Sequence, residues 1–143
     1  MSESDQTTVE QTLRIRARPE TVWTFWTDPE RLVEWWGDTA DLDPQPGGLC
    51  RVAMGGGPVM RGAFVELVPY ERIVFTFGWE VTDGAPEIPP GSTRVEVTLE
   101  PEDGDTVLTL VHTGLPSRYA GEHEAGWGQF LPLLVTAAEA GRP

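Results

Sequence analysis

The sequence has no lysine, one cysteine and no hydrophobic run long enough to span a membrane, and each shortage excludes a class of protein. Its ten basic side chains are all arginine and stand against 23 acidic ones, which gives a formal net charge of −13. Binding to nucleic acid or to an anionic membrane requires clustered cations, so no nucleic acid and no membrane is expected as a partner. No apolar stretch approaches the roughly 18 residues of a transmembrane helix.

The cysteine content and the N-terminus indicate a reducing compartment. Cys50 alone cannot form an internal disulfide, and it lies in an alternating apolar segment, where we interpret it as a small buried hydrophobic residue. The N-terminal stretch "MSESDQTTVEQ" lacks the apolar core of a signal peptide, so a cytoplasmic location is expected. Because the G-x-S-x-G, Walker lysine and H-E-x-x-H motifs are missing, as is a regular spacing of metal ligands, we expect no cofactor and no metal site.

Alternation of apolar and polar residues predicts a chain rich in β-strands. Residues 8–16, "TVEQTLRIR", have the pattern of a half-buried strand. About six more strands follow in the middle of the chain, separated by turn sequences such as Asp103-Gly104. The segment 82–92 contains three prolines and is predicted to be a loop. Sequential antiparallel strands of this kind form a curved sheet with one apolar face.

Three helices are predicted from other signals. Pro19 fits the first turn of a short helix, and Asp28-Pro29 resembles the N-cap and first position of a second one that ends at Gly37. Residues 121–141 repeat apolar side chains every three or four positions, which predicts one long amphipathic helix with a kink at Pro132. Only this helix is long enough to cover the sheet, and a curved sheet covered by one helix tends to enclose a hollow.

The stretch "RLVEWWGD", residues 31–38, places two tryptophans side by side. Neighbours on a helix point about 100° apart, so Trp35 and Trp36 are not expected to share one face. We therefore predict that one ring anchors the small helix in the core and that the other caps the end of the hollow.

Five pieces of the sequence, in order, resemble the activator of heat-shock-protein ATPase-like family within the START, polyketide-cyclase or SRPBCC superfamily. They are "RPETVWTFWTDPERLVEWWG", "PGGLCRV", "GAFVELVPYERIVFTFGW", "DGDTVLTLVHTGLP" and "AGWGQFLPLL". The resemblance implies an α+β helix-grip (START-like) fold, in which a curved antiparallel sheet of about six to seven strands wraps around a long C-terminal helix. Two short helices follow the first strand. It also implies a single START-like domain over residues 8–141, with residues 1–7 expected to be a disordered tail.

What this family resemblance implies about function is divided. Members of the wider superfamily hold lipids, polyketides or other apolar molecules between the sheet and the long helix. The founders of the family instead bind and stimulate a large ATP-dependent chaperone. A small apolar molecule is therefore the first expected partner, and a chaperone or other protein is the second.

An aromatic set is the leading candidate for a ligand site. Phe75, Phe77 and Trp79 alternate along one predicted strand and so face the same way. Apolar pockets with few polar groups are the usual form of a small-molecule site, although a packed core is the alternative use of such rings. With the last helix and the twin tryptophans included, the predicted ligand-binding residues are Trp35, Trp36, Met54, Phe75, Phe77, Trp79, His112, Trp127, Phe130 and Leu131.

The two histidines are the candidate polar groups. His112 ends an inward-facing row of the last strand, where it could orient a ligand or act as a general base near neutral pH. A structural role at the strand end is the alternative. His123 precedes Trp127 by one helical turn and faces either the mouth of the hollow or solvent. Two histidines without a third ligand do not predict a metal site.

Three functional classes follow. The first in rank is a non-catalytic carrier or sensor that binds a small hydrophobic or aromatic ligand between the sheet and the C-terminal helix. The second is a polyketide cyclase/dehydratase-like enzyme in which His112 moves a proton. The third is a chaperone-ATPase activator-like interaction module, whose acidic surface suits a basic partner.

Overall fold

The computed structural model describes residues 6–80 and 87–140, in which seven strands and three helices follow one another. In chain order the elements are β1 (Gln6–Ile15), α1 (Pro19–Thr27), α2 (Pro29–Leu32), β2 (Thr39–Leu42), β3 (Leu49–Ala53), β4 (Val59–Val68), β5 (Arg72–Phe77), β6 (Thr93–Glu102), β7 (Asp105–Pro116) and α3 (Ser117–Ala140). None of the helices in this described part is long and apolar enough to cross a membrane.

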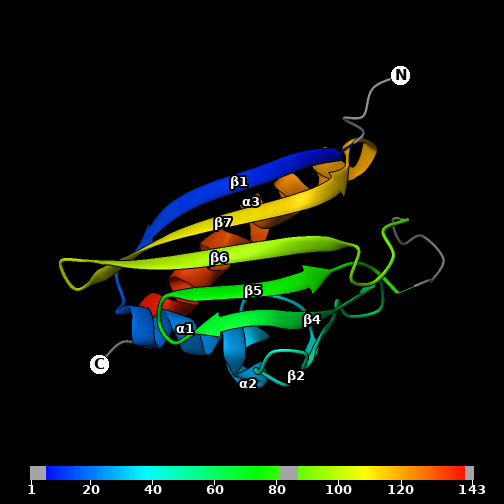
Figure 1. The fold of residues 1–143 in the computed structure, drawn as a ribbon. Coiled ribbons are helices and arrows are strands. Elements are labelled where there is room, and N and C mark those ends of the chain that lie inside the picture. Colours follow the sequence, from blue (N-terminus) through cyan, green and yellow to red (C-terminus); the bar gives the residue numbers. More distant parts are fainter. Residues whose placement is uncertain (1–5, 81–86, 141–143) are drawn as a thin grey trace.

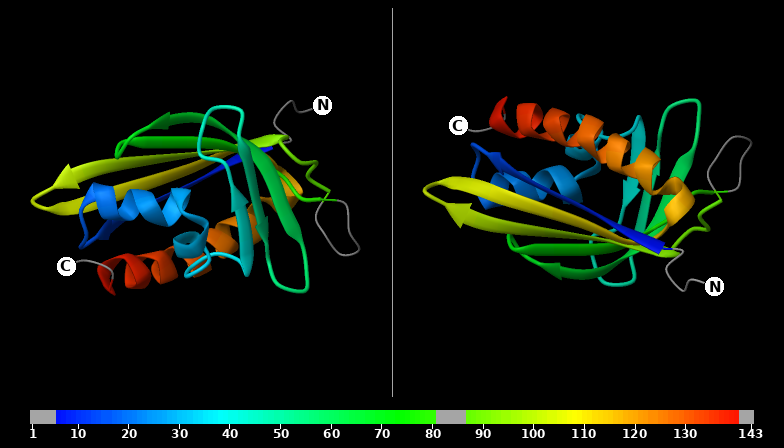
Figure 2. Two further views of the ribbon diagram at one scale, coloured as in Figure 1. Left: turned by 90° about the horizontal axis from the view of Figure 1, so that it is seen from below. Right: turned by 90° about the horizontal axis from the view of Figure 1, so that it is seen from above.

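The strands form one antiparallel sheet with the order β1-β7-β6-β5-β4-β3-β2 (Figure 1). From β2 to β7, strands that are adjacent in the sheet are also consecutive in the sequence. Strand β1 is the exception, because it lies at one edge of the sheet and pairs with β7. The sheet curls strongly, and α1 and α3 both lie on its concave side (Figure 2). The predicted α+β helix-grip fold, with a curved sheet of about six to seven strands and a long C-terminal helix, is confirmed.

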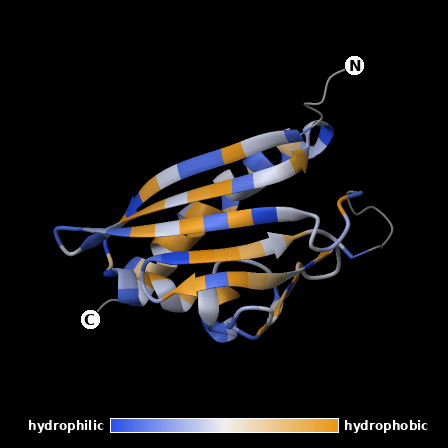
Figure 3. Cartoon of the chain, viewed as in Figure 1, coloured by the Kyte–Doolittle hydropathy of each residue, from blue (hydrophilic) through white to orange (hydrophobic). Residues whose placement is uncertain are grey.

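The core lies between the concave face of the sheet and the helices. Hydrophilic and hydrophobic residues alternate along β6, so that one face of this strand points into the core (Figure 3). Cys50 on β3 is buried, and this burial raises the pKa of its thiol to about 12 because the thiolate loses its hydration. The interpretation of Cys50 as a small buried hydrophobic residue is confirmed.

The predicted element starts are close to those observed. The helices α1 and α2 begin at Pro19 and Pro29 as expected, and the Asp28 side chain caps α2 by accepting a hydrogen bond of 3.0 Å from the Glu30 amide. Strand β1 begins two residues earlier and α3 four residues earlier than the periodicity predicted. The Asp103-Gly104 hairpin is also confirmed, because both residues have the positive φ angles of a type I′ turn.

The predicted end of the second short helix at Gly37 is wrong. Helix α2 ends at Leu32, and the amides of Trp35 and Trp36 both donate to the Leu32 carbonyl in the turns that follow. Gly37 then has a φ of +82°, and a Cβ there would overlap the Val52 side chain on β3. The close approach of this turn to β3, rather than helix propensity, therefore decides where the segment changes direction.

Three other predictions concern regions that the structure tests only in part or not at all. Of the predicted loop 82–92, residues 82–86 lie outside the described residues, and the remainder contains no strand before Thr93. Residues 1–5 of the predicted tail also lie outside them. Pro132 lies inside α3, and the helix continues past it to Ala140. The kink at this position stays a prediction.

Candidate functional site

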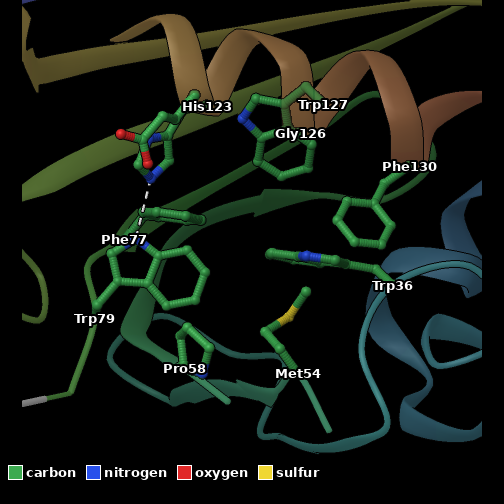
Figure 4. A pocket seen from close by; sticks show the side chains of 10 residues that line it. Trp36, Met54, Pro58, Phe77, Trp79, His123, Gly126, Trp127 and Phe130 are labelled. Carbon is green, nitrogen blue, oxygen red and sulfur yellow. Dashed lines mark hydrogen bonds between the residues drawn. The ribbon is translucent and has the colours of Figure 1, made fainter. Parts of the chain in front are cut away.

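A pocket of about 260 Å³ lies between the first half of α3 and the end of the sheet where β3, β4 and β5 meet. The residues that line it are Trp36, Met54, Pro58, Phe77, Trp79, Glu122, His123, Gly126, Trp127 and Phe130. Figure 4 shows the side chains of Trp36, Trp79 and Trp127 around one shared space, with Met54 and Pro58 on the side away from α3. The volume lies slightly below the roughly 300 Å³ at which usual ligand pockets begin, which limits the site to a small guest.

Helix α3 supplies one wall of the pocket through its periodicity. His123, Gly126, Trp127 and Phe130 occupy positions i, i+3, i+4 and i+7 and therefore lie on one face of the helix. A Cβ built on Gly126 meets no atom within 4 Å, so the missing side chain leaves open space at the pocket. The spacing of the apolar residues predicted this face, and Gly126 widens the hollow beneath it.

The sheet and the turns supply the opposite wall. Phe77 is the last residue of β5, and Trp79 follows it and forms an isolated β-bridge with Met60 on β4. The Trp79 amide also donates to the Ile88 carbonyl at 2.7 Å. These backbone contacts extend the sheet pattern beyond β5 and hold the Trp79 ring at the pocket.

The twin tryptophans have different surroundings. Trp35 is 2% exposed, and its Nε1 donates to the Phe25 carbonyl at 2.8 Å, while Trp26 packs on it at 4.7 Å between ring centroids. Trp36 instead lines the pocket, with its ring centroid 5.1 Å from that of Trp127. One ring thus anchors the segment and the other reaches the hollow, as expected. The two rings nevertheless stack on each other at 5.6 Å and 28°, because the helix ends before them.

His112 is completely buried in a chain of hydrogen bonds and does not line the pocket. Its Nδ1 accepts a bond of 3.1 Å from Trp127 Nε1, so the ring proton is on Nε2, which donates to Thr93 Oγ1 at 2.9 Å. Thr93 in turn donates to the Phe77 carbonyl at 2.8 Å. Burial, and secondarily the nearby His123, lower the pKa of His112 to about 3. The imidazole is therefore neutral, with both nitrogens already paired.

His123 links α3 to the end of β5. Its Nδ1 donates to the Tyr119 carbonyl at 2.8 Å, and its Nε2 accepts a bond of 3.0 Å from Trp79 Nε1 (Figure 4). The side chain is buried and lines the pocket. Of the two positions expected for His123, the structure therefore shows the one at the hollow, where it holds Trp79 in place.

The structure brings six of the ten predicted ligand-binding residues together at the pocket. The other four, Trp35, Phe75, His112 and Leu131, lie in the core instead. Phe75 shares the face of Phe77, but it lies two residues deeper in the sheet, where its ring packs against Trp26 and Phe64. Sequence reasoning did not assign Pro58 or Glu122 to the site. It identified Gly126 only as one of two glycines that flank Trp127 and let another backbone or a ligand approach closely.

The described residues contain no group of three or more His, Cys, Asp or Glu side chains that could hold a metal ion. The pocket wall is instead almost entirely aromatic and apolar. Its polar atoms are the His123 ring, which is engaged with Trp79, the indole nitrogens and the carboxylate of Glu122. Such a wall can enclose a small apolar group, and it presents few hydrogen-bonding atoms to orient a polar one.

Comparison with solved structures identifies relatives along nearly the whole chain. An AHSA1-like protein from Rhizobium etli is 40% identical; the match covers 96% of this chain and 84% of that one, with a TM-score of 0.74. DynU16, a protein of the dynemicin biosynthetic locus, is 26% identical with a TM-score of 0.78 over 95% of this chain. The chain spans 48% of the length of DynU16.

A third structure, protein MLL2253 from Mesorhizobium loti, has a TM-score of 0.82 at 24% identity, covers 96% of this chain and 100% of its own, and shows the shared fold alone. No curated protein matches the chain significantly. The model of the family described as activator of Hsp90 ATPase homolog 1-like protein matches residues 16–139. The chain therefore belongs to the activator of Hsp90 ATPase homolog 1-like protein family.

Proposed function

We propose that this protein binds a small hydrophobic or aromatic molecule in the pocket beneath α3 and acts as a non-catalytic carrier or sensor. The observation that carries the proposal is a space of about 260 Å³ that three indoles, two phenyl rings and a methionine surround without filling. Apolar surface left in contact with water costs roughly 25 cal/mol per Å². A ligand that covers this surface recovers that free energy, so an apolar guest is the expected occupant.

The surroundings of the histidines favour a carrier over an enzyme of the cyclase type. A general base must come within hydrogen-bond reach of its substrate, directly or through one water. His112 is completely buried behind Trp127 and has both nitrogens paired, while the Nε2 of His123 already accepts from Trp79. Proton transfer by either ring would first require one of these hydrogen bonds to break.

The exposed surface favours a small molecule over a protein partner. The family description refers to an activator of the Hsp90 ATPase, which makes a chaperone the alternative partner. The large hydrophobic residues exposed in the described part, Val65, Tyr70 and Leu133, lie on β4, on the following turn and on α3, and so do not share one element. DynU16 belongs to a biosynthetic locus, which supports a small-molecule role here.

The free Cys50 suits the cytoplasm, which we propose as the location.

Replacing Gly126 by leucine is expected to weaken ligand binding at least tenfold. The new side chain would occupy the open space that the missing Cβ leaves at the pocket wall. Folding should be preserved, because a glycine in the interior of a helix destabilises the helix by roughly 0.5–1 kcal/mol relative to alanine. Tryptophan fluorescence titration with a panel of aromatic and acyl compounds measures the effect, together with native mass spectrometry of freshly purified protein.

Gly121→Leu is the matched control for this substitution. Gly121 is an exposed glycine of the same helix, a Cβ there also meets nothing within 4 Å, and it does not line the pocket. The control should therefore bind like the wild type. The proposal fails if native mass spectrometry finds no bound species and no compound in the panel changes the fluorescence.

A further inference from the structure

The rings around the pocket form a cage with differently inclined walls. Trp36 and Trp127 lie at 51° to each other with their centroids 5.1 Å apart, and Phe77 and Trp79 lie at 84° with centroids 5.3 Å apart. A guest among such rings meets aromatic faces as well as edges. The faces carry partial negative charge and attract a cation within about 6 Å of the ring centroid, most strongly when the ring is tryptophan.

The formal charge in the pocket wall is negative. Glu122 is exposed, lines the pocket and has no hydrogen-bond or ion-pair partner among the described residues. Glu80, the residue after Trp79, is by contrast engaged: it accepts from Arg51 at 2.8 Å and pairs with Arg61 at 3.3 Å, and these contacts lower its pKa. Glu122 is therefore the carboxylate that remains to face a ligand.

No positive side chain balances this carboxylate within the wall. None of the described residues that line the pocket is an arginine. Arg118, one turn before Glu122 on α3, forms an ion pair of 3.6 Å with Glu87. The formal net charge of −13 adds a long-range attraction for cations and a repulsion of anions.

The hydrogen-bonding groups of the wall are mostly used within the protein. The indole nitrogens of Trp79 and Trp127 donate to His123 and His112. Trp36 Nε1 is the exception. Among the indole nitrogens of the wall, it alone has no hydrogen-bond partner in the described part of the chain. An anion would thus exchange its water shell for a single donor, which is costly. A quaternary ammonium group carries no N–H and accepts no hydrogen bond, so it needs neither donors nor acceptors.

We propose that the pocket selects a small hydrophobic cation, namely a quaternary ammonium group on an aromatic or aliphatic body, with its charge among the indoles and facing Glu122. This inference rests on the proposed function, because it specifies the class of ligand for the same pocket. The volume of about 260 Å³ corresponds to on the order of nine water molecules at roughly 30 Å³ each, so the cation is compact.

Three probes of the same shape and different charge test the proposal. They are phenyltrimethylammonium, its neutral isostere tert-butylbenzene and the anion benzenesulfonate, each titrated into the full chain with tryptophan fluorescence as the signal. We expect the cation to bind about fivefold or more tighter than the neutral isostere, and the anion to bind weakest. The order should hold at constant ionic strength, which keeps long-range screening equal.

Substitution of Glu122 by glutamine tests whether the carboxylate at the edge of the pocket attracts the cation. We expect about a threefold loss for phenyltrimethylammonium and no change for tert-butylbenzene, because only the cation is attracted by the carboxylate. Glu124→Gln removes the same charge from an exposed position of the same helix that does not line the pocket. This control should leave the affinity for both probes unchanged.

The outcomes separate this inference from the proposed function. If tert-butylbenzene binds as tightly as the cation, or benzenesulfonate binds tighter, and Gly126→Leu abolishes that binding, the pocket is a ligand site but the cation proposal is overturned. If Glu124→Gln weakens the cation as much as Glu122→Gln, the assignment of Glu122 is overturned. If none of the probes, nor any compound of the wider panel, binds to the wild type, both proposals are overturned.

Discussion

Lowering the pH from 7 to 4 is expected to destabilise the protein by roughly 3 kcal/mol through His112 alone. The folded protein holds His112 neutral, with a pKa of about 3 against an ordinary value of 6.5, because the ring is buried. Between these two values the unfolded chain binds a proton that the folded protein does not. The contribution of His112 to stability therefore rises with pH in this window. It is fully present above about pH 6.5, and it falls by about 1.4 kcal/mol for each pH unit below that value until the pKa of the folded protein is reached.

The variant His112→Gln isolates this contribution. A glutamine amide can accept from Trp127 and donate to Thr93, but it does not titrate. The titratable group that faces His112 is His123, whose ring centroid lies 5.9 Å away; the other ring partners, Phe77 and Trp127, carry no charge. Urea unfolding at pH 7 and at pH 4 should show a smaller loss in the variant than in the wild type, by roughly 3 kcal/mol.

The exposed carboxylates contribute to acid destabilisation in both proteins and cancel in this comparison. His123→Gln, which leaves His112 and its two hydrogen-bonded partners in place, should retain most of the pH dependence that is due to His112, because burial is the main cause of its low pKa. Parallel stability curves for the wild type and His112→Gln between pH 7 and pH 4 would show that the buried imidazole does not resist protonation.

Replacing Trp35 by alanine is expected to lower the free energy of unfolding by about 3–5 kcal/mol. The ring is almost completely buried, contacts Trp26 and Trp36, and donates a hydrogen bond of 2.8 Å to the Phe25 carbonyl. Its removal leaves both a cavity and an unpaired carbonyl. Since single domains are stable by only about 5–15 kcal/mol, chemical denaturation should show a large shift of the midpoint.

Two further variants separate the causes of this loss. Trp35→Phe keeps most of the apolar volume and removes the hydrogen bond, so a smaller loss of about 1–2 kcal/mol is expected. Trp23→Ala removes a half-buried ring of α1 that contacts Tyr70 edge-on, and should cost less than Trp35→Ala. Equal losses for Trp23→Ala and Trp35→Ala would contradict the role of Trp35 as the anchor of the segment after α2.

The elements of the fold were predictable because side-chain periodicity is local. The period of two over β1 and the period of 3.6 over α3 record which residues meet the core, whatever the core contains. Pro19 and Asp28-Pro29 marked two helix starts for the same reason, since the fixed φ of proline suits the first helical position and the Asp28 side chain caps a nearby backbone amide. The end of α2 was not predictable, because the contact of Gly37 with β3 joins segments that are distant in sequence.

The site was predictable in composition but not in its limits. Phe75 and Phe77 lie on the same face of β5, yet only Phe77 lies far enough along the strand to reach the pocket. The role of His112 depended on Thr93 and Trp127, which are 19 and 15 residues away in the chain. No local pattern records such partners, so the sequence left a general base and a structural histidine as open alternatives.

The sequence by itself determined the family, the α+β helix-grip architecture and the aromatic character of the space under α3, since these depend on the order of residue types along the chain. Only the tertiary structure decided which rings fill the core and which leave a vacancy, because that depends on how far each side chain lies from its non-local neighbours. The pairing of His112, the open space at Gly126 and the position of Glu122 at the rim all result from the curvature of the sheet around one helix.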